Sequence, residues 1–281
     1  MRVTELPGAG VNVAGLDLRG PVPQETIDRL EKLFRDRHLL VVREQSLTAS
    51  DQVRVSGWFG PVRISPKGPV AYVSNTRPDG LVPEGPLPFH SDMSFTESPL
   101  LGLSLYAIEV PSHGASTLFA NAAAAVGRLP EPTRKKLEGR RVLNIAGYGS
   151  NFSTRRQEAD CDPHEPRTYH PAISPHPVTG TPVIRANGLS TAHVEGMAHD
   201  ESEHVLQETF DILYSADNVY EHHWQVGDFV VFDNIAIHHA RRDFDATEPR
   251  TLRRVVLDER EPFSVSPEVT ALYERAARQS D

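Results

Sequence analysis

The chain has 281 residues, enough for one large domain with a buried core, and its 38% hydrophobic and 24% charged residues are ordinary for a globular protein. The formal net charge of −9 argues against nucleic acid or an anionic membrane as the main partner, although a local arginine cluster would still bind an anionic small molecule. The single cysteine, Cys161, excludes an internal disulfide, and no apolar leader or membrane-length segment is seen, so we expect a cytoplasmic protein.

The first half of the chain contains clear helix and strand patterns. Residues 24–37 put apolar side chains on one helical face just after Pro23, which predicts a helix. Residues 38–44, HLLVVRE, predict a buried strand, and residues 101–110, LGLSLYAIEV, predict another. Residues 114–130 run from a strand into a short helix.

The second half repeats this alternation. Asp200 as N-cap, with Glu203 three residues later, predicts a helix over residues 200–215. Two strands joined by a turn-rich segment and a closing amphipathic helix are predicted at residues 229–239, 251–258 and 266–278.

Residues 146–199 are polar and rich in Gly, Pro and His, which is typical of a lid or a binding loop. We therefore expect residues 1–281 to form a single domain in which 146–199 is a loop-rich insertion or lid. Short strands flanked by helices, without regular βαβ alternation, predict a mainly β fold with flanking helices, a β-sandwich or jelly roll. The sequence has no Gly-rich phosphate loop and no GxSxG motif.

The stretch FHSDMSF holds His90 and Asp92, which point the same way if it is a strand. In a chain with 13 histidines one such pair is expected by chance, so the pair alone is weak. Two histidines and a carboxylate would leave open positions on an octahedral ion, as in non-haem Fe(II) oxygenases, and zinc accepts the same set. The candidates for the second histidine are His222, His223, His238 and His239. Because neighbouring residues of a strand face opposite ways, at most one of His238 and His239 faces the ion.

The strand RTLRRVVL places Arg250 and Arg254 on one face and Arg253 on the other. Two arginines on one face form either a solvated edge with ion pairs or a clamp for a carboxylate, because guanidinium donates two parallel hydrogen bonds. The residues by themselves leave both interpretations open.

The segments FHSDMSF, GASTLFAN and GDFVVFDNIAIHHARRDF, followed by PRTLRR, together resemble the taurine-dioxygenase (TauD/TfdA-like) family of Fe(II)/2-oxoglutarate-dependent oxygenases. The resemblance covers residues 10–260. It implies a double-stranded β-helix, a jelly roll of the cupin type. It also implies an enzyme that uses Fe(II), 2-oxoglutarate and O2 to oxidise a C–H bond, normally by hydroxylation, with release of succinate and CO2.

Matching the family pattern residue by residue implies roles for individual positions. Thr117 and Arg250 match positions that contact 2-oxoglutarate. Arg254 matches a second active-site arginine, shared between the cosubstrate and the anionic group of the substrate. The implied catalytic metal ligands are His90, Asp92 and His239.

The substrate region is less well defined. We expect residues 146–199 and 72–89 to form a substrate lid, with Tyr72, Asn75 and Phe89 lining the substrate site.

Two departures from the family pattern bear on the substrate. Ile235 stands where the family has an arginine after "DN", and Pro86 stands where the taurine enzyme has a polar substrate-binding residue. Taurine is therefore a doubtful substrate. Asp92 is present, whereas halogenating relatives have a small residue there, which favours oxygenation.

The expected partner is a small, anionic organic molecule, with no nucleic acid and no membrane, and the default assembly is a homodimer. Two alternatives stay open: a zinc-dependent hydrolase or isomerase on the same barrel, and a non-catalytic relative that binds a ligand. The intact set of ligand-type residues counts against the second alternative.

Overall fold

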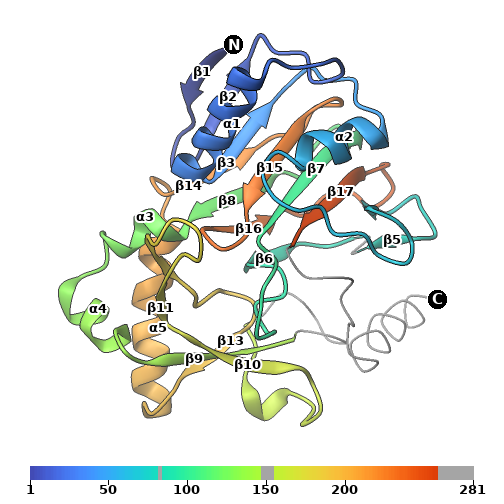
Figure 1. Cartoon of the computed structure of the whole chain (residues 1–281). Helices are drawn as coiled ribbons and strands as arrows, with labels where there is room; N and C mark the ends of the chain where they lie inside the picture. The colour runs from blue at the N-terminus through green and yellow to red at the C-terminus, as the bar shows by residue number, and fades with distance from the viewer. Residues whose placement is uncertain (82–83, 147–154, 259–281) are drawn as a thin grey trace.

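The computed structural model describes residues 1–81, 84–146 and 155–258. Two sheets face each other (Figure 1): the smaller is antiparallel, and the larger is mainly antiparallel with two parallel pairs, β2–β3 and β4–β5. The larger sheet has the strand order β1-β2-β3-β15-β7-β17-β4-β5. Its strands are β1 (Arg2–Glu5), β2 (Val11–Ala14), β3 (Leu39–Val42), β4 (Val70–Ser74), β5 (Gly80–Leu81), β7 (Gly102–Glu109), β15 (Phe229–Asp233) and β17 (Thr251–Leu257).

The smaller sheet has the order β14-β8-β16-β6 and carries the residues of greatest chemical interest. Strands that lie far apart in the sequence meet in it, because β6 comes from the first third of the chain and β16 from the last. Its strands are β6 (Leu87–His90), β8 (Thr117–Asn121), β14 (Val219–His222) and β16 (Ile237–Arg241).

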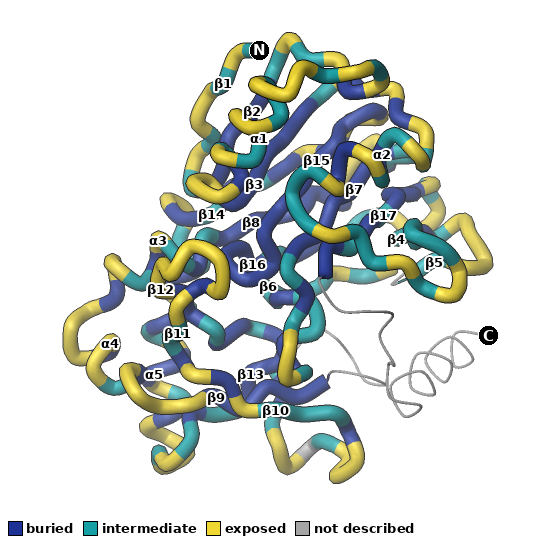
Figure 2. Tube along the Cα trace, viewed as in Figure 1, coloured by how far each residue is buried: buried dark blue, intermediate teal, exposed yellow. Residues whose placement is uncertain are grey.

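The core between the sheets follows from side-chain alternation along the strands. In β3, Leu39 and Val41 point into the space between the sheets, where they join Phe119 of the smaller sheet. Leu40 and Val42 point to the other face. Both faces of β3 are therefore buried, which explains its uninterrupted apolar sequence, and Figure 2 shows the central strands as buried.

Two helices cover the outer face of the larger sheet (Figure 1): α1 (Gln24–Arg37) and α2 (Ala49–Ser56). Helix α1 packs Leu30 and Phe34 onto that face, and α2 packs Val55 onto it. Burying one Leu or Phe side chain contributes roughly 1.5–3 kcal/mol, so α1 is held mainly by this apolar face.

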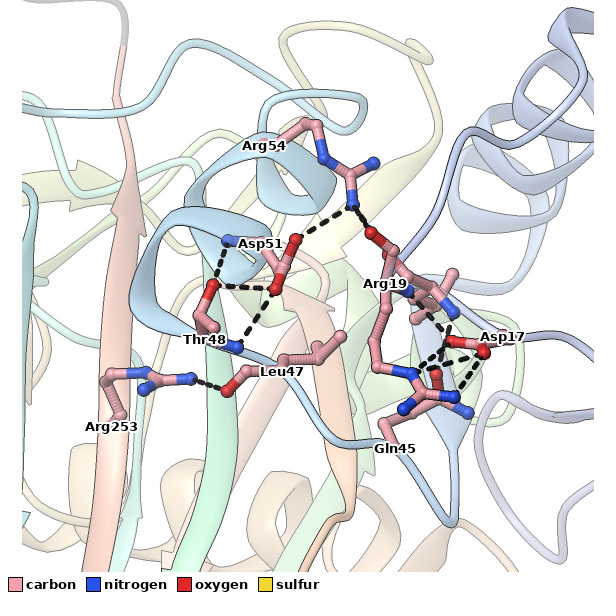
Figure 3. A network of polar contacts seen from close by, with 9 residues as sticks. Asp17, Arg19, Gln45, Leu47, Thr48, Asp51, Arg54 and Arg253 are labelled. Carbon is pink, nitrogen blue, oxygen red and sulfur yellow. Dashed lines mark hydrogen bonds and ion pairs between the residues drawn. The ribbon is translucent and has the colours of Figure 1, made fainter.

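Helix α2 begins with a capping box. Thr48 Oγ1 accepts a hydrogen bond from Asp51 N (3.1 Å), and Asp51 Oδ2 accepts one from Thr48 N (3.1 Å). Figure 3 shows this cap beside Arg253, whose guanidinium donates to the Leu47 carbonyl at 2.7 Å. The cap thus fixes the start of α2 against the outer face of β17.

A second group of elements covers the outer face of the smaller sheet, away from the larger one. A core cluster that includes Ala120, Leu137, Val205 and Leu213 joins these elements to β8. They are α3 (Ala122–Val126), α4 (Glu131–Leu137), β9 (Arg141–Ile145), β10 (Arg167–Pro171), β11 (Ile173–Pro175), β12 (Pro182–Ile184), β13 (Thr191–Val194) and α5 (His199–Leu213).

The predicted jelly-roll architecture is confirmed, and most predicted elements are present. One detail is wrong: helix α5 begins after Ala198, which makes no side-chain cap, so Asp200 lies inside the first turn and is not the N-cap. Residues 229–239 form two strands in different sheets, not one. The predicted helix at 266–278 lies outside the described residues.

The described part of the segment 146–199 forms more regular secondary structure than its composition predicts. It contains β10 to β13 and a short 3-10 helix (Glu158–Asp160). Whether it acts as a lid stays a prediction. None of the helices among residues 1–81, 84–146 and 155–258 is long and apolar enough to cross a membrane.

Candidate active site

Strands β6 and β16 pair so that His90 and His239 lie opposite each other. Asp92 follows two residues after His90, and one potential ligand atom from each of the three side chains lies within 4.8 Å of the others. His90 Nε2 is 3.3 Å and His239 Nε2 is 3.7 Å from Asp92 Oδ1. The His239 ring also contacts Phe232 of the inter-sheet core, with ring centroids 4.9 Å apart. The cluster therefore sits between the two sheets.

The Asp92 carboxylate is ionised. Its second oxygen, Oδ2, accepts a hydrogen bond from Arg254 Nη2 at 2.6 Å. Burial by itself would raise the pKa of Asp92, but Arg254, then His90 and His239, hold that pKa well below its ordinary range. Arg254 thereby engages one oxygen and leaves the other facing the two imidazoles.

The backbone around Asp92 is fixed by Asn234, in the turn between β15 and β16. Asn234 Oδ1 accepts from Asp92 N at 2.8 Å, and Asn234 Nδ2 donates to Asp92 O at 3.0 Å and to Leu100 O at 2.9 Å. Ser91 Oγ donates to the Asn234 carbonyl at 2.6 Å. The Asp–Asn pair of the sequence thus ends β15 and brackets the candidate carboxylate ligand.

The two ring nitrogens of His90 have different hydrogen-bonding partners. His90 Nδ1 lies 2.8 Å from the Pro88 carbonyl, which can only accept a hydrogen bond, so Nδ1 carries the proton and Nε2 keeps its lone pair. Burial, and next the nearby His90, lower the pKa of His239 to about 3, so its imidazole is neutral. The Nε2 atoms of both histidines face Asp92, and each would offer a lone pair to a metal ion in its deprotonated form.

Two arginines and a threonine lie beside the cluster. Thr117 of β8 is the cross-strand partner of Arg241 of β16. Arg250 is 3% exposed, and its Nε makes no hydrogen bond with any residue the structure describes. Burial, and next the Arg241 guanidinium, lower the pKa of Arg250 to about 9. A buried guanidinium of this kind requires an anionic partner.

The site therefore fits both groups of an Fe(II)/2-oxoglutarate enzyme. The donor set of two imidazoles and one carboxylate suits a divalent transition metal with open positions. The unpaired Nε of Arg250 suits the distal carboxylate of a dicarboxylic acid.

The structure places two of the three predicted lining residues elsewhere. Tyr72 pairs with Arg253 across β4 and β17, so it lies on the outer face, where Arg77 stacks on its ring at 3.7 Å. Asn75 donates to the Ala246 and Glu248 carbonyls and accepts from Arg250 N, so its amide holds the loop before β17. The lining role of Tyr72 is therefore corrected, because its side chain lies on the outer face; Asn75 contacts the backbone of Arg250, and a lining role for its side chain stays a prediction.

Phe89 is also misplaced in the prediction. It neighbours His90 in β6 and therefore points to the opposite face, where it stacks on Tyr214 with ring centroids 4.1 Å apart. The Tyr214 hydroxyl lies 3.2 Å from His238 Nδ1. Phe89 and His238 thus pack behind the two candidate ligand histidines, in the outer cluster.

The remaining candidate histidines are separate from the cluster. His222 is fully buried, with Nε2 3.0 Å from Asp228 Oδ2, and His223 is exposed. Sequence reasoning gave no role to Arg241, Asn234 or Trp224. The position of Arg241 beside the cluster could have been inferred from the sequence, because it follows His239 by two residues on one strand. The contacts of Asn234 depend on a turn geometry that the sequence does not show.

Comparison with known proteins agrees with this geometry. Residues 2–256 match the family described as "Taurine catabolism dioxygenase TauD, TfdA family". The alpha-ketoglutarate-dependent 2,4-dichlorophenoxyacetate dioxygenase of Cupriavidus pinatubonensis is 28% identical over 272 residues, 88% of this chain and 94% of that protein. The (S)-phenoxypropionate/alpha-ketoglutarate-dioxygenase of Sphingobium herbicidovorans is 28% identical, covering 86% and 88%.

A solved structure shows the same fold. The crystal structure of AAD-2 in complex with Mn(II) and N-oxalylglycine superposes with a TM-score of 0.75 at 25% identity, covering 93% of this chain and 98% of that one. The match over almost the whole chain establishes that this protein belongs to the TauD/TfdA family of Fe(II)- and 2-oxoglutarate-dependent dioxygenases.

Proposed function

We propose that the protein uses the cluster between its sheets to oxidise, normally by hydroxylation, a C–H bond of a small anionic organic molecule. His90, Asp92 and His239 hold Fe(II). Thr117 and Arg250 hold the distal carboxylate of 2-oxoglutarate. The observation that carries the proposal is the pairing of a compact two-histidine, one-carboxylate cluster with a buried arginine that lacks a hydrogen bond at Nε.

When bound, iron and 2-oxoglutarate supply the oxidising power, with O2 as oxidant and with succinate and CO2 as co-products. The protein supplies placement and charge. Asp92 and the two histidines fix the metal position, and the apolar walls that include Phe119 and Phe232 exclude water from the inner side.

Arg254 has a double role in this proposal. Its Nη2 holds Asp92 Oδ2, which keeps the carboxylate in one orientation. A guanidinium has five N–H donors, and Arg254 makes no other side-chain hydrogen bond with the described residues. The remaining donors face the region of the cluster and are available to the cosubstrate or to the anionic group of the substrate.

The anionic substrate class has support from two directions. Arg254 places positive charge beside the cluster, and its side chain is 17% exposed, so it is still reachable. The names of the relatives specify 2,4-dichlorophenoxyacetate and (S)-phenoxypropionate, both organic acids. Asp92 occupies the ligand position, which favours oxygen transfer over halogenation.

We also propose that residues 146–199, together with residues 72–89, cover the substrate. Leu189 N donates to the Phe89 carbonyl at 3.1 Å, and Asn187 Nδ2 donates to Ser94 Oγ at 3.1 Å, so this segment is fastened on both sides of the candidate ligands. Deleting residues 155–165 should weaken substrate binding, and unchanged affinity would contradict the lid. A cytoplasmic homodimer completes the proposal, and light scattering in solution tests the assembly.

The central test is spectroscopic. Fe(II) and 2-oxoglutarate are added without oxygen, and a weak metal-to-ligand charge-transfer band is expected in the visible spectrum. The band should be lost in His239→Ala and in Arg250→Ala. A substrate screen scored by succinate release then identifies the acid. Absence of the band, with neither ligand bound, would reject the oxygenase assignment of this site and redirect attention to zinc chemistry.

A further inference from the structure

Three inward-facing residues form a row across the smaller sheet next to the cluster. Thr117 of β8 is the cross-strand partner of His222 on one side and of Arg241 on the other. Trp224 follows His222 by two residues and donates from its indole Nε1 to Thr117 Oγ1 at 2.9 Å. Both residues are buried, with Thr117 4% and Trp224 7% exposed.

This hydrogen bond determines how the Thr117 hydroxyl is used. An indole N–H is only a donor, so Thr117 Oγ1 must be the acceptor. The hydroxyl proton of Thr117 is not consumed by any hydrogen bond among residues 1–81, 84–146 and 155–258. We propose that Trp224 is a positioning residue for the cosubstrate, because its indole N–H holds the Thr117 hydroxyl as a donor to the distal carboxylate of 2-oxoglutarate.

The indole is itself held in place. Its ring meets the His222 ring edge-on, with centroids 4.5 Å apart and planes at 87°. His222 lies between the Tyr220 hydroxyl, 3.0 Å from Nδ1, and Asp228, 3.0 Å from Nε2. Asp228 is fully buried and accepts from Arg43 Nη1 at 2.7 Å. Polar contacts therefore connect Arg43 through Asp228 to His222, and the His222 ring packs against the indole. This arrangement restricts the indole to one orientation.

A tryptophan at this position makes a physical difference. Without its N–H, the Thr117 hydroxyl would be free to rotate and to present a lone pair to the incoming carboxylate. With it, one lone pair of Thr117 Oγ1 is occupied, which favours the hydroxyl as a donor to the carboxylate that Arg250 is proposed to bind. A fixed donor lowers the entropy lost on binding.

This inference rests on the proposed role of Thr117, and the experiment separates the two. The readout is the Kd of 2-oxoglutarate for the Mn(II)-loaded protein, measured by titration calorimetry, which does not depend on turnover. Trp224→Phe keeps an aromatic ring, although a smaller one, and removes the N–H, and we expect the Kd to rise about fivefold. The matched control is Trp58→Phe, which changes the other tryptophan of the chain and should leave the Kd unchanged.

A double-mutant cycle shows whether Trp224 acts through Thr117. Thr117→Val should weaken 2-oxoglutarate binding, and adding Trp224→Phe to it should cause no further loss. An equal additional loss in the Val background would overturn the inference. If Thr117→Val weakens binding and Trp224→Phe does not, the Trp224 inference fails alone. If neither changes the Kd, the assigned role of Thr117 fails together with it.

Two further measurements keep the inference open to rejection if Trp224→Phe does not fold. Replacing Trp224 by 3-benzothienyl-alanine substitutes sulfur for the N–H at nearly constant shape, and it should give the same rise in Kd. 2-Oxobutyrate lacks the distal carboxylate, so its Kd should be unaffected by either replacement. A parallel loss of 2-oxobutyrate affinity would show a general packing defect and overturn the inference.

Discussion

Among the described residues, a partly buried group and a fully buried group have the same composition, two histidines and one aspartate. One lies between the sheets and the other at the end of β15. They are His90, Asp92 and His239 in the first group, and His38, His176 and Asp233 in the second. In both, the aspartate pKa is held below its ordinary range against the opposing effect of burial.

The two groups differ in what their lone pairs already bind. Asp233 Oδ1 accepts from the backbone N–H groups of Ile235 and Ala236, and Oδ2 lies 2.8 Å from His176 Nε2. His176 Nδ1 accepts from the N–H groups of Val178 and Thr179. Asp233 thus holds the turn between β15 and β16, and His176 Nδ1 holds the turn at residues 176–179, so the lone pairs of these two residues are used in structure.

In the Asp92 group, by contrast, the contacts leave lone pairs available. Arg254 takes one carboxylate oxygen and Pro88 takes the Nδ1 proton of His90, while both Nε2 atoms face the other carboxylate oxygen. The comparison teaches that residue type and proximity do not identify a metal site. Unused lone pairs that converge on one point do. The Asp233 group still serves the site, because its turn carries Asn234, which holds the Asp92 backbone.

The largest difference is expected for metal binding. His90→Ala should reduce Fe(II)-dependent succinate release to background and weaken Mn(II) binding by more than about 100-fold, beyond the usual cost of losing an outer-shell partner. Its effect on the unfolding of the metal-free protein should be small, because the ring donates one hydrogen bond, to Pro88 O. Metal titration and urea unfolding of the same samples measure both. Retained metal affinity would remove His90 from the site.

For the group of His38, His176 and Asp233 we expect a loss of stability and no loss of metal binding. His176→Ala leaves the buried Asp233 carboxylate without its nearest partner, so the free energy of unfolding should fall by about 3 kcal/mol. Urea unfolding of the metal-free protein measures it. The folded variant should still bind one Mn(II) per chain. Loss of stoichiometric binding in a folded His176→Ala protein would show that the two groups are not functionally distinct.

Acid pH provides a milder test of the same contrast. Because the pKa of Asp233 is lower in the folded than in the unfolded chain, its stabilising contribution is present above the unfolded value of about 4 and is lost as the pH falls toward the folded value. Asp233→Asn should therefore be less stable than the wild type at pH 7, and the difference should shrink below about pH 4. Unfolding free energies at a series of pH values test this. A constant difference would mean that the ionised carboxylate is not what holds the turn.

The sequence predicted the fold and the ligand set because both depend on local patterns and on a strong family resemblance. Alternation along a strand indicated that at most one of His238 and His239 faces the ion, and the resemblance selected His239. In the structure His239 and Arg254 lie on the side of the cluster, and His238 and Arg253 lie on the opposite faces. The same rule, applied to Phe89, would have excluded it from the lining, since it neighbours His90.

Other features could not be obtained from the sequence. Tyr72 faces outward because β4 pairs with β17 in a register that only the folded sheet fixes. Trp224 reaches Thr117 across 107 positions of sequence, through the pairing of β14 with β8. The start of α5 was misplaced because Asp200 satisfies the capping pattern equally well one position inside the helix.

The smallest expected effect concerns Arg254, which distinguishes the two groups chemically: it donates to Asp92, whereas no arginine within the described part of the chain donates a hydrogen bond to Asp233. Arg254→Met keeps the length of the side chain and removes the hydrogen bond to Asp92 Oδ2. The freed carboxylate would rotate and lose its single orientation, so Mn(II) affinity should fall about tenfold, the lower end for an outer-shell partner. Arg253→Met is the matched control on the next residue of β17: it loses its hydrogen bonds to Gln52 and Leu47 on the outer face and should lower stability without changing metal affinity. Equal loss of affinity in both variants would mean that β17 supports the site only as packing, and that the orientation of Asp92 is set by Asn234 alone.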